Sequence, residues 1–218
     1  MGEPMFTMNH RSFTLVALLS TLLLAPVLRA GTPLICHPYN IGDARSLPSG
    51  PDWHGVSRHY DRANLTRDTL ALLTPDTPVL VRMETLRRAA IYATAGMRQR
   101  DRDAYSADDR ATATSLFERL RERTKDASGS ARALALFDAG FFVETLRHAR
   151  MDLGVDGYAL VAKAAELRPG DAEIDFALAL ATSWPGRRDN HAAHLRSARN
   201  GAKPGTLLVV NLRSHFGG

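Results

Sequence analysis

The chain has 218 residues, of which 28 are lysine or arginine and 23 are aspartate or glutamate, and its formal net charge is +5. The basic residues are nearly all arginines that alternate with acids, as in FERLRERTKD, which is typical of solvated helix faces and excludes the clustered basic surface that nucleic-acid binding needs. The length fits one domain, and the single cysteine excludes an intramolecular disulfide bond.

Residues 1–30 have the features of an export signal. Arg11 precedes the apolar run TLVALLSTLLLAPVL, and Ala30 offers a small residue for cleavage. The run has about 15 residues, or about 22 Å of helix, against a hydrocarbon core of about 30 Å. We therefore expect cleavage after Ala30, with an uncleaved anchor as the alternative, and a periplasmic or secreted protein without a stable membrane span. Met8 is an alternative start to Met1.

Residues 31–60 hold four prolines and four glycines, which predicts an extended or looped segment. Its apolar residues indicate that the segment packs on the rest of the domain. These residues are Leu34, Ile35, Tyr39, Ile41, Leu47 and Trp53.

Cys36 and His37 allow four interpretations: a lipid anchor, a haem attachment point, a metal ligand or an ordinary buried thiol. A lipid-modified cysteine follows a small residue, whereas Ile35 stands here. Haem attachment uses C-x-x-C-H, but Pro33 occupies the place of the first cysteine. We favour a buried, unreactive thiol and keep a haem or metal protein that uses Cys36-His37 as the alternative.

Residues 61–216 are predicted to be helical nearly throughout. DRANLTRDTLALL forms a first helix, and a second begins with Thr77 as its N-cap and Pro78 at the first helical position. Gly96 is a natural stop for the second helix. Its apolar residues recur at spacings of three and four, as one face of a helix requires. They are Val79, Met83, Leu86, Ala90 and Ala93.

Two further helices come next in the chain. Ser106 and Asp109 form a capping box at the start of the third helix, which ends by ASGS. ARALALFDAGFFVETLRHARMD is the most apolar helix. Glu84 and Glu144 have arginine neighbours, and we expect solvated ion pairs there, one of them between Glu84 and Arg88 across a helical turn. Because no convincing alternating β pattern occurs, the predicted fold class is all-α.

The C-terminal third repeats itself with a period near 34 residues. Two pairs of residues match at a separation of 34, and two Pro-Gly pairs match at 35. They are Val161 with Leu195, Ala164 with Ala198, and Pro169-Gly170 with Pro204-Gly205. A period of 34 with a proline after the second helix is typical of tetratricopeptide-type hairpins. The repeat predicts that TLLVV is helical and that residues 206–216 form a short capping helix.

PGDAEIDFALA resembles the start of a tetratricopeptide repeat, and the resemblance covers residues 131–216. The chain departs from the family because the motif tryptophan is missing and Thr182 stands at the tyrosine position. Extending the register back to LFDAGFFVE requires about five inserted residues. The front half also resembles exported bacterial helical proteins of unknown function, which implies an architecture and no activity.

The resemblance implies a concave groove lined by the first helix of each hairpin, and hence a protein or peptide partner. Aromatic residues would anchor the peptide, and two glutamates would orient a basic or N-terminal group. The alternative is that the phenylalanines only fill the core. The exposure of their side chains distinguishes a groove residue from a core residue. The groove would be lined by Leu134, Phe137, Phe141, Glu144, Glu173, Leu180 and Trp184.

Two histidine pairs are weak metal candidates. His54 and His59 lie close in sequence, and His191 and His194 share a helix face, but neither pair has an obvious third ligand, whereas zinc sites use three or four. The sequence lacks G-x-S-x-G, H-E-x-x-H, a P-loop and G-x-G-x-x-G. We therefore predict no catalytic residue and no cofactor, with a haem or metal protein as the alternative.

Overall fold

The computed structural model describes residues 2, 33–50, 55–95, 105–183 and 190–217. The chain divides into two compact units, Met1–Ala30 and Gly31–Gly218. The expected signal at residues 1–30 lies outside the described residues apart from Gly2. All the described helices belong to the second unit.

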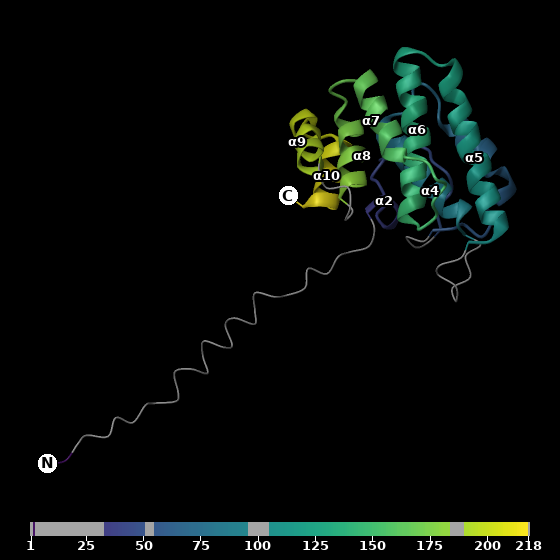
Figure 1. Cartoon of the computed structure of the whole chain (residues 1–218), viewed down its shortest axis with the longest axis horizontal. Helices are drawn as coiled ribbons and strands as arrows, with labels where there is room; N and C mark the ends of the chain where they lie inside the picture. The colour runs from purple at the N-terminus through teal and green to yellow at the C-terminus, as the bar shows by residue number, and fades with distance from the viewer. Residues whose placement is uncertain (1, 3–32, 51–54, 96–104, 184–189, 218) are drawn as a thin grey trace. The chain divides into compact units, whose positions relative to one another are not determined.

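The described part of the second unit contains helices and no strand, which confirms the all-α prediction (Figure 1). None of the described helices has the length and apolar character needed to cross a bilayer. The elements are α2 (Pro33–Cys36), η2 (Arg62–Asn64), α3 (Leu65–Leu72), α4 (Val79–Ala93), α5 (Ala107–Asp126), α6 (Gly129–His148), α7 (Gly157–Leu167), α8 (Ala172–Thr182), α9 (His191–Gly201) and α10 (Leu207–Phe216).

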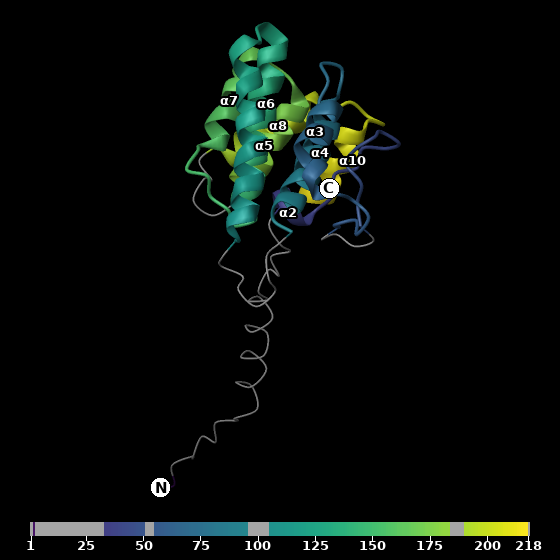
Figure 2. The ribbon, with the colours of Figure 1, turned by 90° about the vertical axis from the view of Figure 1, so that its right-hand side faces the viewer.

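The longer helices form an inner and an outer layer. Helices α4, α6 and α8 pack on one another, while α5 and α7 cover α6 and α9 covers α8. Burial follows this division: α4 buries every residue except Arg88, whereas α9 buries only Ala198. Figure 2 shows α5, α6 and α7 side by side. The inner helices therefore hold most of the core.

The signals for helix starts are partly confirmed. Ser106 and Asp109 form the predicted capping box, with the Asp109 amide 3.0 Å from Ser106 Oγ. Thr77 was predicted as the N-cap of α4, but Pro78 holds that position. The Thr77 hydroxyl instead donates to the Leu72 carbonyl at 2.8 Å, which closes the turn between α3 and α4. The predicted stop at Gly96 lies outside the described residues.

The described part of the segment after the expected cleavage site packs on the helices. Leu34, Tyr39, Ile41 and Leu47 are buried, and Trp53 lies outside the described residues. Two details differ from the prediction. Pro33–Cys36 forms a helical turn and is not extended. Cys36, the last residue of that turn, is partly exposed, so the prediction of a buried thiol is wrong.

The helix boundaries in the C-terminal third follow the period seen in the sequence. Helices α7 and α9 begin 34 residues apart and also end 34 residues apart. Gly170 and Gly205 follow them with the same positive φ of 79°, which glycine adopts without steric cost. Within TLLVV, residues 207–210 begin α10 and Thr206 is its N-cap, which confirms the helical prediction for that run apart from its first residue.

The pair α6 and α7 meets at two glycines. A Cβ atom on Gly140 would lie 2.6 Å from the Gly157 carbonyl oxygen, and one on Gly157 would lie 2.5 Å from that of Gly140. Real Cβ atoms do not come this close to a carbonyl oxygen, so only glycine allows the two backbones to touch here.

Candidate functional site

The apolar residues of the predicted groove belong to the core. Leu134, Phe137, Phe141 and Leu180 are all less than 7% exposed. The rings of Phe137 and Phe141 stack with centroids 5.5 Å apart. Exposure thus favours the core alternative for these four residues, because they present no surface to a partner. Trp184 lies outside the described residues.

Glu144, also predicted for the groove, joins α6 to α7. Its Oε1 accepts a hydrogen bond from the Tyr158 amide at 2.9 Å, in the first turn of α7. Arg147 Nη1 lies 3.5 Å from the same oxygen. Because Glu144 is buried, the expected solvated ion pair is wrong, and the carboxylate is a structural link between helices.

Glu84 is the second carboxylate for which solvation was expected. The predicted pair with Arg88 exists, with Arg88 Nε 2.7 Å from Glu84 Oε1, but Glu84 is fully buried. Arg87 donates to both carboxylate oxygens, and the Tyr39 amide donates to Oε2 at 3.0 Å. Four donors therefore satisfy a buried charge that would otherwise be very costly.

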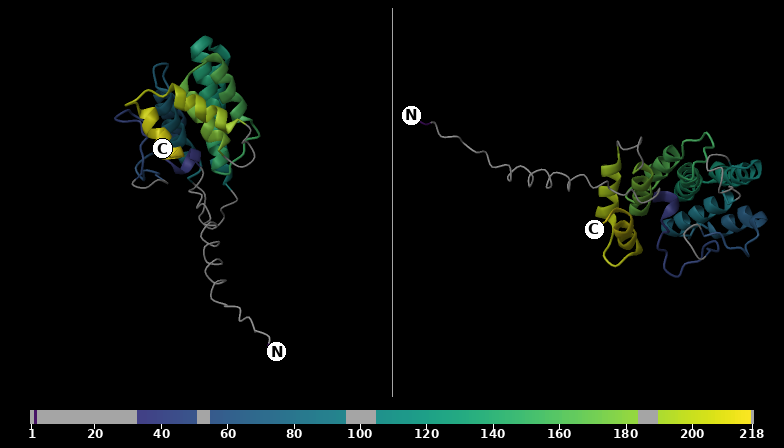
Figure 3. Two further views of the ribbon diagram at one scale, coloured as in Figure 1. Left: turned by 90° about the vertical axis from the view of Figure 1, so that its left-hand side faces the viewer. Right: turned by 90° about the horizontal axis from the view of Figure 1, so that it is seen from below.

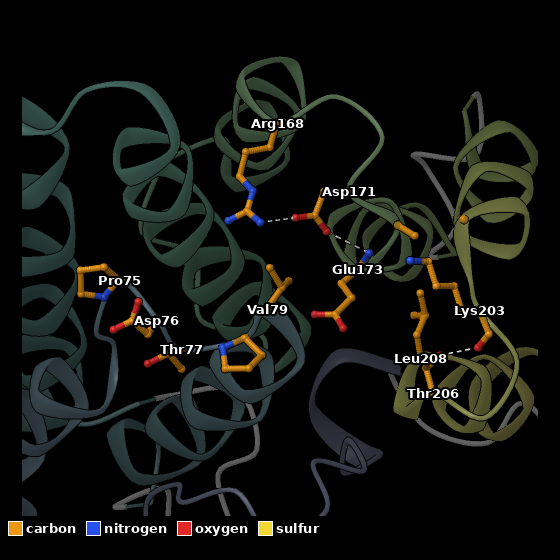
Figure 4. Close-up of a pocket in the computed structure, with 13 residues that line it drawn as sticks. Pro75, Asp76, Thr77, Val79, Arg168, Asp171, Glu173, Lys203, Thr206 and Leu208 are labelled. Atoms are coloured by element: carbon orange, nitrogen blue, oxygen red, sulfur yellow. Dashed lines mark hydrogen bonds and ion pairs between the residues drawn. The ribbon is translucent and has the colours of Figure 1, made fainter.

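A pocket of about 420 Å³ lies beside α4, α8 and the α9–α10 loop. Three stretches of chain line it: residues 75–79 before and at the start of α4, residues 168–173 around the α7–α8 turn, and residues 201–208 from α9 to α10. Figure 4 shows these three groups facing a common space. Because turns and helix ends surround the space, backbone and charged groups line much of it.

Glu173 is the predicted groove residue that lines this pocket. Its Oε2 accepts a hydrogen bond from the Leu80 amide at 3.1 Å, in the first turn of α4. In Figure 4 its carboxylate points between Val79 and Leu208, toward the middle of the space. Burial raises the pKa of Glu173. The backbone hydrogen bonds from Leu80 and Val79 act in the opposite direction, because they favour the charged form. The carboxylate thus occupies the electropositive end of α4.

The remaining charged residues of the pocket divide into those with an ion-pair partner and those without one. Arg168 and Asp171 form an ion pair at 2.8 Å, and Asp171 also caps α8 by accepting from the Glu173 and Ile174 amides. Asp76 and Lys203 are exposed, and neither has an ion-pair partner within the described part of the chain. They are the charges on the pocket rim that a ligand would meet first.

The histidine candidates have roles in helix packing. His191 Nδ1 donates to the Ala179 carbonyl at 2.9 Å, and His194 Nε2 lies 3.0 Å from the Tyr158 hydroxyl. His59 is exposed, and His54 lies outside the described residues. Over the described ranges, no three histidine, cysteine, aspartate or glutamate side chains gather as a metal site would require.

Sequence reasoning missed the buried ion pair that joins α4 to α6. Arg82 Nη1 lies 2.7 Å from Asp138 Oδ2, and both side chains are 1% exposed. Burial raises the pKa of Asp138 to about 6, while Arg82 and then Arg123 act in the opposite direction. Asp138 is the only charge within LALFDAGFF, and a charge inside so apolar a run is the signal that points to a buried partner.

Comparisons with family models, curated proteins and solved structures found no match to this chain.

Proposed function

We propose that the protein is an exported helical scaffold that binds a peptide or protein partner and accepts a cationic group of that partner in the pocket around Glu173. The cationic group is a lysine or arginine side chain or an N-terminal amine. The observation that carries this proposal is a partly buried carboxylate that points into a pocket with one oxygen fixed by the backbone of α4.

The electrostatics favour a cation over an anion. The first turn of α4 attracts negative charge, but Glu173 already supplies it. Asp76 adds a second carboxylate without an ion-pair partner within the described residues, whereas Arg168 is neutralised by Asp171. A cation that enters beside Glu173 would stabilise its charged form and offset the desolvation that raises its pKa. Among the described residues that line the pocket, Lys203 is a cation without an acidic partner and opposes a second cation, but its flexible stem allows it to move aside.

The architecture supports a binding role for the scaffold. The apolar leader indicates export, and the paired helices with 34-residue spacing fit tetratricopeptide-like hairpins, which act through surfaces between neighbouring elements. The pocket volume of about 420 Å³ lies within the usual range for ligand sites, about 300–1,000 Å³. It fits one side chain with its flanking backbone better than a whole folded partner.

The test is a binding measurement with short peptides of defined charge. Pentapeptides with a central lysine or arginine should bind the full protein, and neutral or acidic pentapeptides of matched size should not. Glu173→Gln retains an acceptor for the Leu80 amide but removes the charge, so it should weaken binding at least about tenfold, or about 1.4 kcal/mol. Calorimetry or fluorescence anisotropy gives the affinities.

The matched control is Glu166→Gln. Glu166 is exposed on α7, pairs with Lys163 and carries the same charge as Glu173. It does not line the pocket. Its replacement should leave the affinity unchanged. Equal affinities for the parent and Glu173→Gln, or no binding of any cationic pentapeptide to the parent, would show that this pocket is not the site.

A further inference from the structure

The segment from Pro33 to Gly50 lies against the inner layer of helices. Its helical turn α2 contacts α4, α6 and α8, and Asn40 reaches α10. Figure 3 (right) shows α2, in purple, between the yellow-green helices and the blue-teal helices. Tyr39 of this segment lies over Phe141, one of the residues of the predicted groove.

Side chains on one face of α4 bind the main chain of this segment. The pairs are Arg87 Nη1 with the Ile35 carbonyl (2.9 Å), Glu84 Oε2 with the Tyr39 amide (3.0 Å), Arg88 Nη1 with the Leu47 carbonyl (2.5 Å) and Tyr92 Oη with the Pro48 carbonyl (2.9 Å). Glu84, Arg88 and Tyr92 stand four residues apart, so they project from one helix face. The helix thus contacts four main-chain groups at intervals along the segment.

Asn211 on α10 binds both main-chain groups of one residue. Its Oδ1 accepts from the Asn40 amide and its Nδ2 donates to the Asn40 carbonyl, each at 2.8 Å. Asn211 is 1% exposed. A neighbouring β-strand satisfies a residue with the same donor and acceptor pair, so Asn211 does here what a strand would do for an extended peptide.

Buried side chains complete the interaction. The Tyr39 ring lies among Phe141, Phe176 and His215, with centroid distances of 6.1, 6.3 and 5.1 Å. Leu34 and Leu47 are also buried. Main-chain hydrogen bonds with pockets for some of the side chains are the pattern by which proteins bind extended peptides.

We infer that the inner face of α4, α6, α8 and α10 is a binding site for a peptide with one helical turn followed by an irregular stretch, and that the segment Pro33–Gly50 is its resident ligand in cis. A surface loop usually leaves its main-chain groups to water or pairs them within itself. This segment places six of them on helix side chains that lie more than 35 residues away. An external peptide with the same pattern can bind only after the resident segment has left. The inference does not depend on what occupies the pocket around Glu173.

The test separates the segment from the domain without removing it. A protease recognition sequence is inserted between Gly50 and Gly55. The Gly50 amide donates to the Gly55 carbonyl at 2.8 Å, and both residues follow the part of the segment that contacts α4 and α10. After cleavage of the folded protein, a fluorescent peptide of residues 31–50 is added, with serine replacing Cys36. We expect the cut protein to retain its helical circular dichroism, to keep its segment on size exclusion and to exchange it slowly for the labelled peptide. The uncut protein should take up no label.

Asn211→Ala is the variant that tests the mechanism. It removes both hydrogen bonds to Asn40 and should weaken binding of the labelled peptide at least about tenfold. Asn200→Ala, on the exposed face of α9, is the matched control and should bind like the parent. Glu173→Gln should also bind the label normally, which separates this site from the pocket.

Three results would overturn the inference. They are loss of helical structure on cleavage, absence of label uptake by the folded cut protein, and equal label affinity in the Asn211→Ala and Asn200→Ala variants. The first two would show that Pro33–Gly50 is an integral part of the core and not an exchangeable ligand, and the third would show that the label does not bind through the contact between Asn40 and Asn211.

Discussion

His215 lies at the centre of an aromatic cluster. Its ring stacks on Tyr39 with centroids 5.1 Å apart and meets the edge of Phe176 at 5.5 Å. Burial lowers the pKa of His215 to about 4, and the nearby His37 adds to the effect. A histidine in an unfolded chain titrates at about pH 6.5. Between these two values the unfolded chain binds a proton that the folded chain does not, so stability is lost as the pH falls through this window.

We predict that His215→Phe reduces the sensitivity of the fold to acid. Phenylalanine keeps a ring against Tyr39 and Phe176 but cannot take up a proton. The stability lost between pH 7 and pH 5 should therefore be smaller in the variant than in the parent, by about 1–2 kcal/mol. Urea unfolding at the two pH values measures this difference.

The control is His59→Gln. His59 is exposed, and its replacement should leave the pH profile of stability as it is in the parent. His148, whose pKa burial also lowers to about 4, titrates in all three proteins. Parallel profiles for the parent and His215→Phe would contradict the prediction.

For single residues, the sequence predicted the ion pairs more accurately than it predicted which residues are buried. The spacing of Glu84 and Arg88 predicted their ion pair, which the structure contains. The same spacing gave no sign that Tyr39, 45 residues earlier, covers Glu84 and takes it out of water. Local periodicity describes neighbours on one helix, whereas burial depends on partners that are distant in sequence.

At the scale of helices, the contact between α6 and α7 is set by the absence of two side chains. Gly140 and Gly157 bring the two backbones together, and a Cβ on either residue would collide with the other helix. Glycine lowers helix propensity by about 1 kcal/mol relative to alanine. The close contact must therefore outweigh an intrinsic cost at two positions in adjacent helices.

We predict that Gly157→Ala destabilises the protein even though alanine is the better helix former. The added methyl group must push α6 and α7 apart, and overpacking of this kind costs about 1–3 kcal/mol. Urea unfolding of the parent and the variant gives the difference. Ala159→Gly, at an exposed position in the same helix, measures the effect of helix propensity alone. It should lower the free energy of unfolding by about 1 kcal/mol. A Gly157→Ala variant that is more stable than the parent would refute the close contact.

Helix starts and stops were predictable where the signal is local. The Ser106–Asp109 capping box lies within one turn and was predicted correctly. Thr77 failed as an N-cap because the Leu72 carbonyl, in the preceding helix, binds its hydroxyl instead. The groove residues failed for the same reason on a larger scale. Phe141 has the right position on an inner helix, but Tyr39 lies over it.

For the whole molecule, the expected cleavage site precedes every described residue of the core. Leu34 is fully buried and is the first residue whose side chain is known to enter the core. Cleavage after Ala30 would therefore retain every described residue of the core.

We predict a mature N-terminus close to Gly31. The apolar run of about 15 residues is too short to span about 30 Å of hydrocarbon, so it should act as a cleaved signal. Mass spectrometry of the exported protein gives the mature mass. Ala30→Leu should block processing and yield the longer chain, because the peptidase requires a small residue at the cut. A mature parent protein that retains residues 13–28 would rule out cleavage.

The contact between Asn40 and Asn211 joins residues that are 171 positions apart. Ribosomes add about 5–20 residues per second, so the residues of α10 are made about 10–30 s after those of the segment they bind. Until then the main chain around Asn40 lacks one of its partners, and contacts of such long range form late in folding. We expect a nascent chain in this condition to stay loosely folded while it is being made. For the exported protein that we propose, such a delay would leave the chain loosely folded when it enters a narrow translocation channel.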